Sequence, residues 1–130
     1  MIAGTAHLDD LLVALLNNVR RKANRFTANR QELHRAFLQV KREYPKLMST
    51  FRFRDKASFP ESLGLDQALA NLEASRLLHR QNAAPRFYEI ASDLETAYSK
   101  YVSKRLREAG IDEAEIENAA RRFLDLTHCL

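Results

Sequence analysis

The pattern of apolar and polar positions is clearest between Ser58 and Ala91, where its period changes. Leucines and alanines first follow the i, i+3, i+4, i+7 spacing of one buried helical face, at Leu65, Ala68, Leu69 and Leu72. The turn-forming run 82–85 interrupts the chain after a leucine pair. Residues 86–90 then alternate aromatic or β-branched side chains with charged ones. This stretch predicts a helix that leads directly into a β-hairpin.

Four further helices are predicted by apolar stripes of helical period. They span residues 8–19, 29–44, 92–109 and 112–127. The stripe of the third of these consists of Leu94, Tyr98, Tyr101, Val102 and Leu106. Between the first two helices, Arg25 and Phe26 indicate an isolated strand. After the second helix, residues 51–54 indicate a short strand or an extended loop with both phenylalanines inward.

Helix ends are indicated by their own residue types. Capping boxes, in which a polar side chain at the start is followed three residues later by glutamate, are expected at Asn29, Ser58, Ser92 and Asp112. Gly110 is expected to end the helix that starts near Ser92, since a left-handed residue is favoured there. The last two helices would then form an αα-hairpin that packs on the first helix or on a second copy of the chain.

These elements predict a mostly α fold of the α+β class, with a three-helix core and a small β-hairpin wing. The segment FRFRDKASFPESLGLDQALANLEASRLLHRQ and the following FYEIA resemble winged-helix domains of bacterial regulators. The resemblance covers residues 5–91 of a single domain, 1–130, and leaves the helical hairpin 92–130 outside it. It implies DNA binding, regulation of transcription and dimers formed through the terminal helices. Two features depart from the family pattern: the long connection after Pro45, and the acidic residues of the helix that precedes the hairpin.

Composition is that of a soluble globular domain, with 45% hydrophobic and 29% charged residues. The single cysteine, Cys129, excludes an internal disulfide and a multi-cysteine zinc site. No basic segment precedes the apolar run 11–16, which argues against a secretory signal. The run also follows two aspartates and is too short for a membrane span. We therefore expect a cytoplasmic protein with no membrane partner.

Charge is distributed unevenly along the chain. Residues 1–56 hold twelve Lys or Arg against five Asp or Glu, whereas residues 57–130 hold nine against twelve. The first part therefore carries +7 and the second −3, which gives the net +4 of the whole chain. A basic N-terminal half suits a polyanion such as nucleic acid, although a solvated surface explains it equally well.

No residue pattern indicates catalysis. The four histidines lie in four different predicted elements without metal-ligand spacing, and the three glycines are scattered rather than grouped in a phosphate loop. The acidic clusters lie at helix starts, where negative charge is favourable. We expect no cofactor, no metal and no identifiable small-molecule ligand, and an enzyme is the third-ranked hypothesis.

Two hypotheses about function remain. In the first, the protein is a non-enzymatic DNA-binding regulator that contacts duplex DNA. Phosphate contacts would come from basic residues before the helix that leads into the hairpin, at the end of that helix and in the wing: Arg52, Arg54, Lys56, Arg76, Arg80 and Arg86. Gln67 and Asn71 would read base edges. In the second, the same fold is a protein-interaction or assembly module without affinity for nucleic acid.

Overall fold

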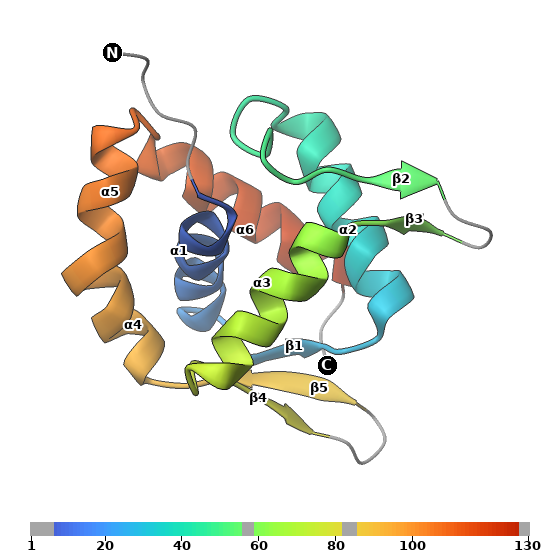
Figure 1. The fold of residues 1–130 in the computed structure, drawn as a ribbon, viewed down its shortest axis with the longest axis horizontal. Helices are drawn as coiled ribbons and strands as arrows, with labels where there is room; N and C mark the ends of the chain where they lie inside the picture. The colour runs from blue at the N-terminus through green and yellow to red at the C-terminus, as the bar shows by residue number, and fades with distance from the viewer. Residues whose placement is uncertain (1–6, 56–58, 82–85, 128–130) are drawn as a thin grey trace.

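The chain folds into helices packed around one central helix, with a small sheet at one end (Figure 1). The computed structural model describes residues 7–55, 59–81 and 86–127. The helices are α1 (Leu8–Arg20), α2 (Arg30–Glu43), α3 (Leu63–Ala74), α4 (Asp93–Ala97), the π-helical turn η1 (Tyr98–Val102), α5 (Ser103–Glu108) and α6 (Glu113–Thr127). The strands are β1 (Arg25–Thr27), β2 (Arg54–Asp55), β3 (Pro60–Glu61), β4 (Leu78–Gln81) and β5 (Phe87–Ile90). The mostly helical α+β class is confirmed.

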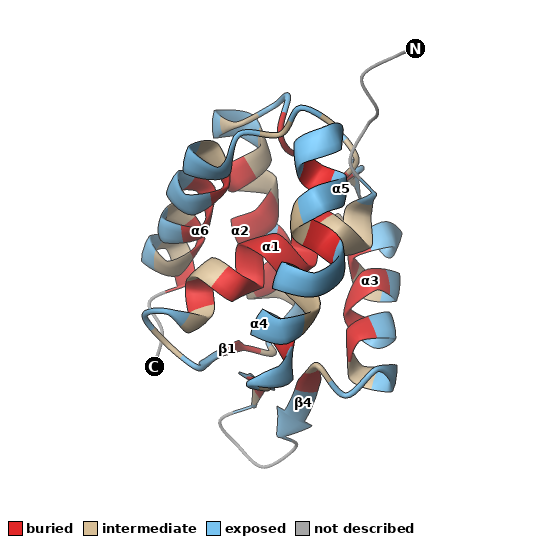
Figure 2. Ribbon diagram, turned by 90° about the vertical axis from the view of Figure 1, so that its left-hand side faces the viewer, coloured by how far each residue is buried: buried red, intermediate tan, exposed pale blue. Residues whose placement is uncertain are grey.

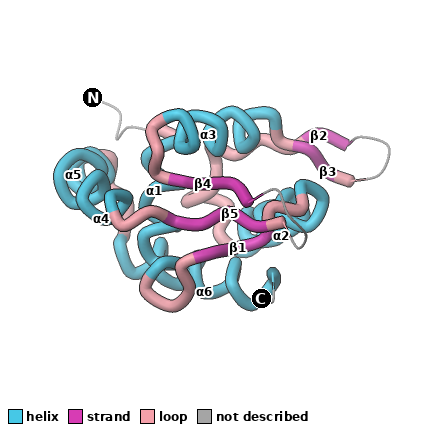
Figure 3. Tube along the Cα trace, turned by 90° about the horizontal axis from the view of Figure 1, so that it is seen from below, coloured by secondary structure: helices cyan, strands magenta, loops and turns pink. Residues whose placement is uncertain are grey.

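The predicted hairpin and isolated strand are both present and belong to one sheet. Its strand order is β1-β5-β4, and both pairings are antiparallel. Phe26 of β1 lies opposite Tyr88 of β5, and the two rings stack with centroids 5.3 Å apart. Seen from below, β4 runs beside α3 and β1 forms the other edge (Figure 3). The sheet therefore ties the end of α3 to the start of α2.

Helix α1 is buried on nearly all sides. The sequence predicts one apolar stripe on this helix, made of Leu8, Leu11, Leu12, Leu15, Leu16 and Val19. Val13, Ala14 and Asn17, which lie off that stripe, are buried as well. Figure 2 shows this burial, and the reason is that α3, the helices α4–α5 and α6 all pack on α1. Gly64 allows the close approach of α3, because a Cβ there would lie 3.1 Å from Leu8 Cδ1.

The C-terminal helices pack on the first helix, which is the first of the two arrangements that the sequence left open. In the described part of the chain, α4, η1 and α5 pack mainly on α1, and α6 packs on α1, α2 and β1. Phe123 of α6 contacts the rings of Phe26 and Phe37, with centroids 5.9 and 4.8 Å apart. Residues 92–127 therefore contribute to the same hydrophobic core as residues 8–91.

The helix after Ser92 contains a π-helical turn, and its buried face differs from the expected stripe at Tyr101. Leu94, Val102 and Leu106 are buried, but Tyr101 is 53% exposed. A π-helical turn holds one extra residue, so the buried face moves from the 101 position to the 102 position. The repeated spacing of four residues between Leu94, Tyr98, Val102 and Leu106 exceeds the helical period of 3.6, and the extra residue accommodates it.

Helix ends match the sequence at some positions and differ at others. The Asn29 side chain accepts a hydrogen bond from the Glu32 N–H at 3.0 Å, as expected of a cap, and Gly110 has φ of 77°. The box at Ser58 was wrong, because Ser62 caps α3 and Glu61 lies in β3; Ser58 itself is outside the described residues. Ser92 makes no capping hydrogen bond through its side chain.

Candidate nucleic-acid interface and associated sites

The exposed face of α3 is uncharged. It consists of Leu63, Gly64, Gln67, Ala70, Asn71 and Ala74. The acidic residues of this helix, Asp66 and Glu73, lie at its flanks and are each paired with an arginine of another element. The two carboxylates of this helix are therefore compensated by arginines of the same chain, which reduces the repulsion between the helix and a phosphate.

Asp66 belongs to a group of paired charges that we call the Arg30 cluster: Arg30, His34, Arg54, Glu61 and Asp66. Arg30 donates to Asp66 at 3.1 Å through Nε and to Glu61 at 2.9 Å through Nη2. Arg54 donates to the other oxygen of Glu61 at 2.9 Å. These bonds join the start of α2 to β2, β3 and α3, and the hydrogen bonds to Arg30 and Arg54 lower the pKa of Glu61.

His34 is the fully buried member of the Arg30 cluster. The Ser62 backbone N–H donates to its Nδ1 at 2.9 Å, so Nδ1 carries no proton and Nε2–H donates to Asp66 at 2.9 Å. Burial lowers the pKa of His34 despite the opposing bond to Asp66. Both ring nitrogens are occupied, so this histidine–carboxylate pair has no free nitrogen for acid–base catalysis.

At the other end of α3, Glu73 accepts from Arg80 of β4 at 3.3 Å. The Arg80 guanidinium also lies 5.6 Å from the ring centroid of Tyr88, and burial raises the pKa of the Tyr88 phenol. A cavity of about 250 Å³ lies between the Arg80–Glu73 pair and the Arg30–Asp66 pair. Its other lining residues include Leu33, Leu69 and Tyr88. Arg80 therefore stabilises the junction of α3 and the hairpin, and Glu73 compensates part of its positive charge.

The eight sequence-predicted contact residues differ in how free they are. Arg52, Arg76 and Arg86 are exposed and form no ion pair with the described residues. Arg54 and Arg80 are engaged with Glu61 and Glu73. Gln67 donates to Asn71, which itself donates to Asp9 of α1 at 3.0 Å. Lys56 lies outside the described residues.

Arg76 has a feature that the sequence pattern missed. Its φ is +63°, in the left-handed region, and the Leu77 N–H bonds to the Leu72 carbonyl at 2.9 Å across it. This is the helix ending at which glycine is strongly favoured. An arginine there costs backbone free energy but places an exposed cation between α3 and β4.

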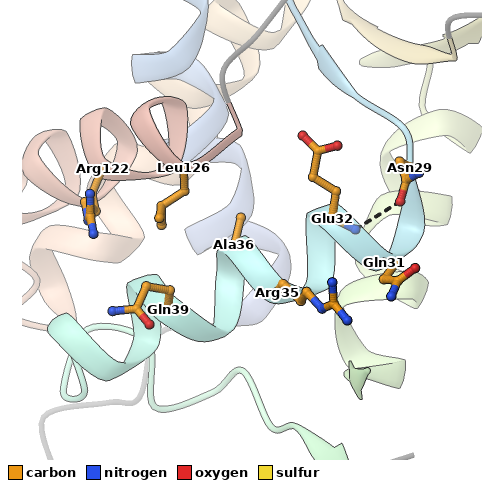
Figure 4. Close-up of a pocket in the computed structure, with 8 residues that line it drawn as sticks. All are labelled: Asn29, Gln31, Glu32, Arg35, Ala36, Gln39, Arg122 and Leu126. Atoms are coloured by element: carbon orange, nitrogen blue, oxygen red, sulfur yellow. Dashed lines mark hydrogen bonds between the residues drawn. The ribbon is translucent and has the colours of Figure 1, made fainter. Parts of the chain in front are cut away.

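A cavity of about 610 Å³ lies between α2 and α6 (Figure 4). Leu126 points toward Ala36, and Arg122 lies near Gln39 at one end. Arg122 is held by Glu43 at 3.0 Å. The lining is mixed and mostly polar, and it contains neither a group of metal-ligating side chains nor a catalytic pair, so it favours no particular chemistry.

Within the described ranges, no group of three or more His, Cys, Asp or Glu is placed to hold a metal ion. No helix in those ranges is both long and apolar enough to cross a membrane. Comparison with protein-family models, with curated proteins and with solved structures finds no match.

Proposed function

We propose that the protein is a winged-helix DNA-binding or regulatory protein. The observation that carries the proposal is the order α1-β1-α2-β2-β3-α3-β4-β5, in which a hairpin follows α3 and β1 completes the sheet of that hairpin. In winged helices, the helix before the wing enters the major groove and the wing contacts the backbone. Here α3 would take the first role, and the β4–β5 hairpin the second.

The charges around α3 support this proposal. Because Asp66 and Glu73 are paired internally, the outer face of α3 would approach DNA without a carboxylate directed at a phosphate. Arg76 at the end of α3 and Arg86 beside β5 are exposed cations suited to phosphate contact. Gln67 is the candidate for reading a base edge, whereas Asn71 is already held by Asp9.

Charge reversal at these two arginines tests the proposal. The double variant Arg76→Glu, Arg86→Glu is expected to bind random-sequence duplex DNA at least about tenfold more weakly than the wild type. The slope of log K against log salt is expected to fall by about two, one for each lost phosphate contact. Fluorescence anisotropy with a labelled duplex at several salt concentrations measures both quantities.

A matched control is available on α5. Lys104→Glu, Arg107→Glu makes the same change in net charge at exposed positions away from α3 and the sheet. This control should keep most of the affinity. Equal losses in the two double variants would mean that net charge alone drives binding, and binding by the wild type that ignores salt would contradict the proposal.

Arg76→Gly separates the backbone of this residue from its charge. Glycine relieves the left-handed conformation, so the free energy of unfolding is expected to rise by about 0.5–1 kcal/mol. The same variant should bind DNA more weakly, because the cation is gone. Urea denaturation and the anisotropy titration measure the two effects, and a fall in stability would show that the arginine side chain contributes to packing.

The alternative function is a protein-interaction or assembly module. Leu63 on the outer face of α3 favours it, because 54% of this leucine is exposed on a face with few charges. A homodimer through the C-terminal helices would have to use outward residues such as Tyr101, because Leu94, Val102 and Leu106 are buried within the chain. Under this alternative the wild type shows no affinity for DNA, and Leu63→Ala or Tyr101→Ala disrupts an oligomer detected by light scattering.

A further inference from the structure

A second cavity, of about 290 Å³, lies where α1, α3 and the C-terminal helices meet. Its apolar lining comes from all three parts of the fold: Val13, Leu72, Leu77, Ala97, Tyr101 and Val102. Its polar lining consists of Asp9, Asp10, Asn71, Ser75 and Arg105. We propose that this cavity binds a small organic amine with an aromatic or aliphatic body, a function that goes beyond DNA binding and does not depend on it.

The π-helical turn is the first argument for a ligand. Tyr101 and Val102 belong to this turn, and both line the cavity. Such turns are uncommon and occur frequently at functional sites. Here the turn leaves Val102 in the core and places Tyr101 at the surface, where 53% of it is exposed. An exposed aromatic ring at the edge of a cavity with apolar and polar walls is suited to cover a bound ligand.

The polar residues of the cavity argue for a cationic ligand. Arg105 donates to both oxygens of Asp10, at 2.7 and 2.8 Å, so the charge of Asp10 is compensated. Asp9 accepts from the neutral amide of Asn71 and forms no ion pair within the described residues. The charged groups of the lining, Asp9, Asp10 and Arg105, therefore sum to −1, and Asp9 is the carboxylate without an ion-pair partner among the described residues. An ammonium group on the ligand would compensate it.

The body of the ligand is constrained by the apolar lining. Leu72 and Val102 are buried at 5% and 4% exposure, so an aromatic or branched aliphatic group in the cavity would contact core side chains. Lys100 lies over the Tyr101 ring, with Nζ 5.4 Å from its centroid, but does not line the cavity. Asn71 belongs to α3 and Ser75 directly follows its last residue, so an occupied site would contact the helix that is proposed to enter DNA.

Three probes of similar shape test the proposal by isothermal titration calorimetry on the full chain. They are 2-phenylethylamine, which is a cation at neutral pH, the neutral 2-phenylethanol and the anionic 3-phenylpropionate. The amine is expected to bind saturably, with one site per chain, about tenfold more tightly than the alcohol. The anion is expected to show no binding. No saturable binding of the amine at millimolar concentration, or equal binding of amine and anion, would overturn the proposal.

Variants locate the binding in this cavity. Asp9→Asn should remove the preference for the amine over the alcohol, and Ser75→Tyr, a change at an exposed helix end, should fill the cavity and abolish binding of both. Leu63→Ala is the matched control for Tyr101→Ala, because the two side chains are about equally exposed and Leu63 does not line the cavity. Tyr101→Ala should weaken the amine about tenfold and Leu63→Ala should not. Equal effects of these two variants, or an unchanged preference in Asp9→Asn, would overturn the assignment.

Discussion

Phe123→Ala is expected to lower the free energy of unfolding by about 3–5 kcal/mol, the range for removing a buried phenylalanine. Phe123 is 3% exposed, and its ring contacts Phe37 of α2 and Phe26 of β1. The side chain therefore fills the space at which α6, α2 and the sheet meet. Alanine would leave a cavity there, because three separate elements cannot all move inward to close it.

Urea denaturation followed by circular dichroism measures this loss, and Leu63→Ala is its control. The control removes an apolar side chain that is 54% exposed, so its effect should stay within about 0.5 kcal/mol. A loss of less than about 1 kcal/mol in Phe123→Ala would contradict the packing of α6 on α2 and β1. It would then favour a C-terminal segment that folds apart from the rest.

His34→Ala is expected to cost about 2–4 kcal/mol and to change how stability depends on pH. Removing the ring leaves the buried Ser62 N–H without an acceptor and Asp66 without one of its donors. The loss therefore exceeds that of one ordinary hydrogen bond. Arg30 would remain bound to Asp66, so the rest of the Arg30 cluster should persist.

The sign of the pH effect follows from the lowered pKa of His34. Above about pH 6.5, the usual value for histidine, the ring is neutral in both the folded and the unfolded chain. As the pH falls below this value, His34 binds a proton in the unfolded chain but stays neutral in the folded chain, because its pKa there is lower. The wild type should therefore lose stability between about pH 6.5 and 5, before the carboxylates begin to titrate near pH 4.

Denaturation midpoints across this pH window test the prediction. His34→Ala should show a flatter profile than the wild type, because it lacks the group that titrates. His79→Ala removes an exposed histidine of β4 and should keep the wild-type profile. Parallel profiles for the wild type and His34→Ala would show that other groups cause the acid sensitivity.

Several local features could be predicted because they depend on neighbouring residues. The β4–β5 hairpin, the strand at Arg25 and the cap at Asn29 all lie where the sequence placed them. The start of α3 was misplaced, because Ser58 and Ser62 both offer a capping hydroxyl. The competition was decided by Glu61, which pairs with Arg54 across β2 and β3 and so keeps this residue out of the helix.

The candidate interface was harder to predict because ion pairs join distant positions. Arg30 meets Asp66 over 36 residues, and Asn71 meets Asp9 over 62. The number of charged residues near α3 can be read from the sequence, but the pairs in which they compensate each other cannot. The left-handed Arg76 left no mark in the pattern either, since glycine is the usual residue at such a helix end.

The helices and the hairpin could be read from the chain alone, because they follow from the periodicity of apolar residues and from local capping. The tertiary structure decided that the C-terminal helices surround α1, that Asp66 and Glu73 are neutralised, and that the cavity beside Tyr101 exists. Those features depend on where separate elements meet in space. A pattern that repeats within one helix fixes which face is apolar, but it carries no information on which partner covers that face.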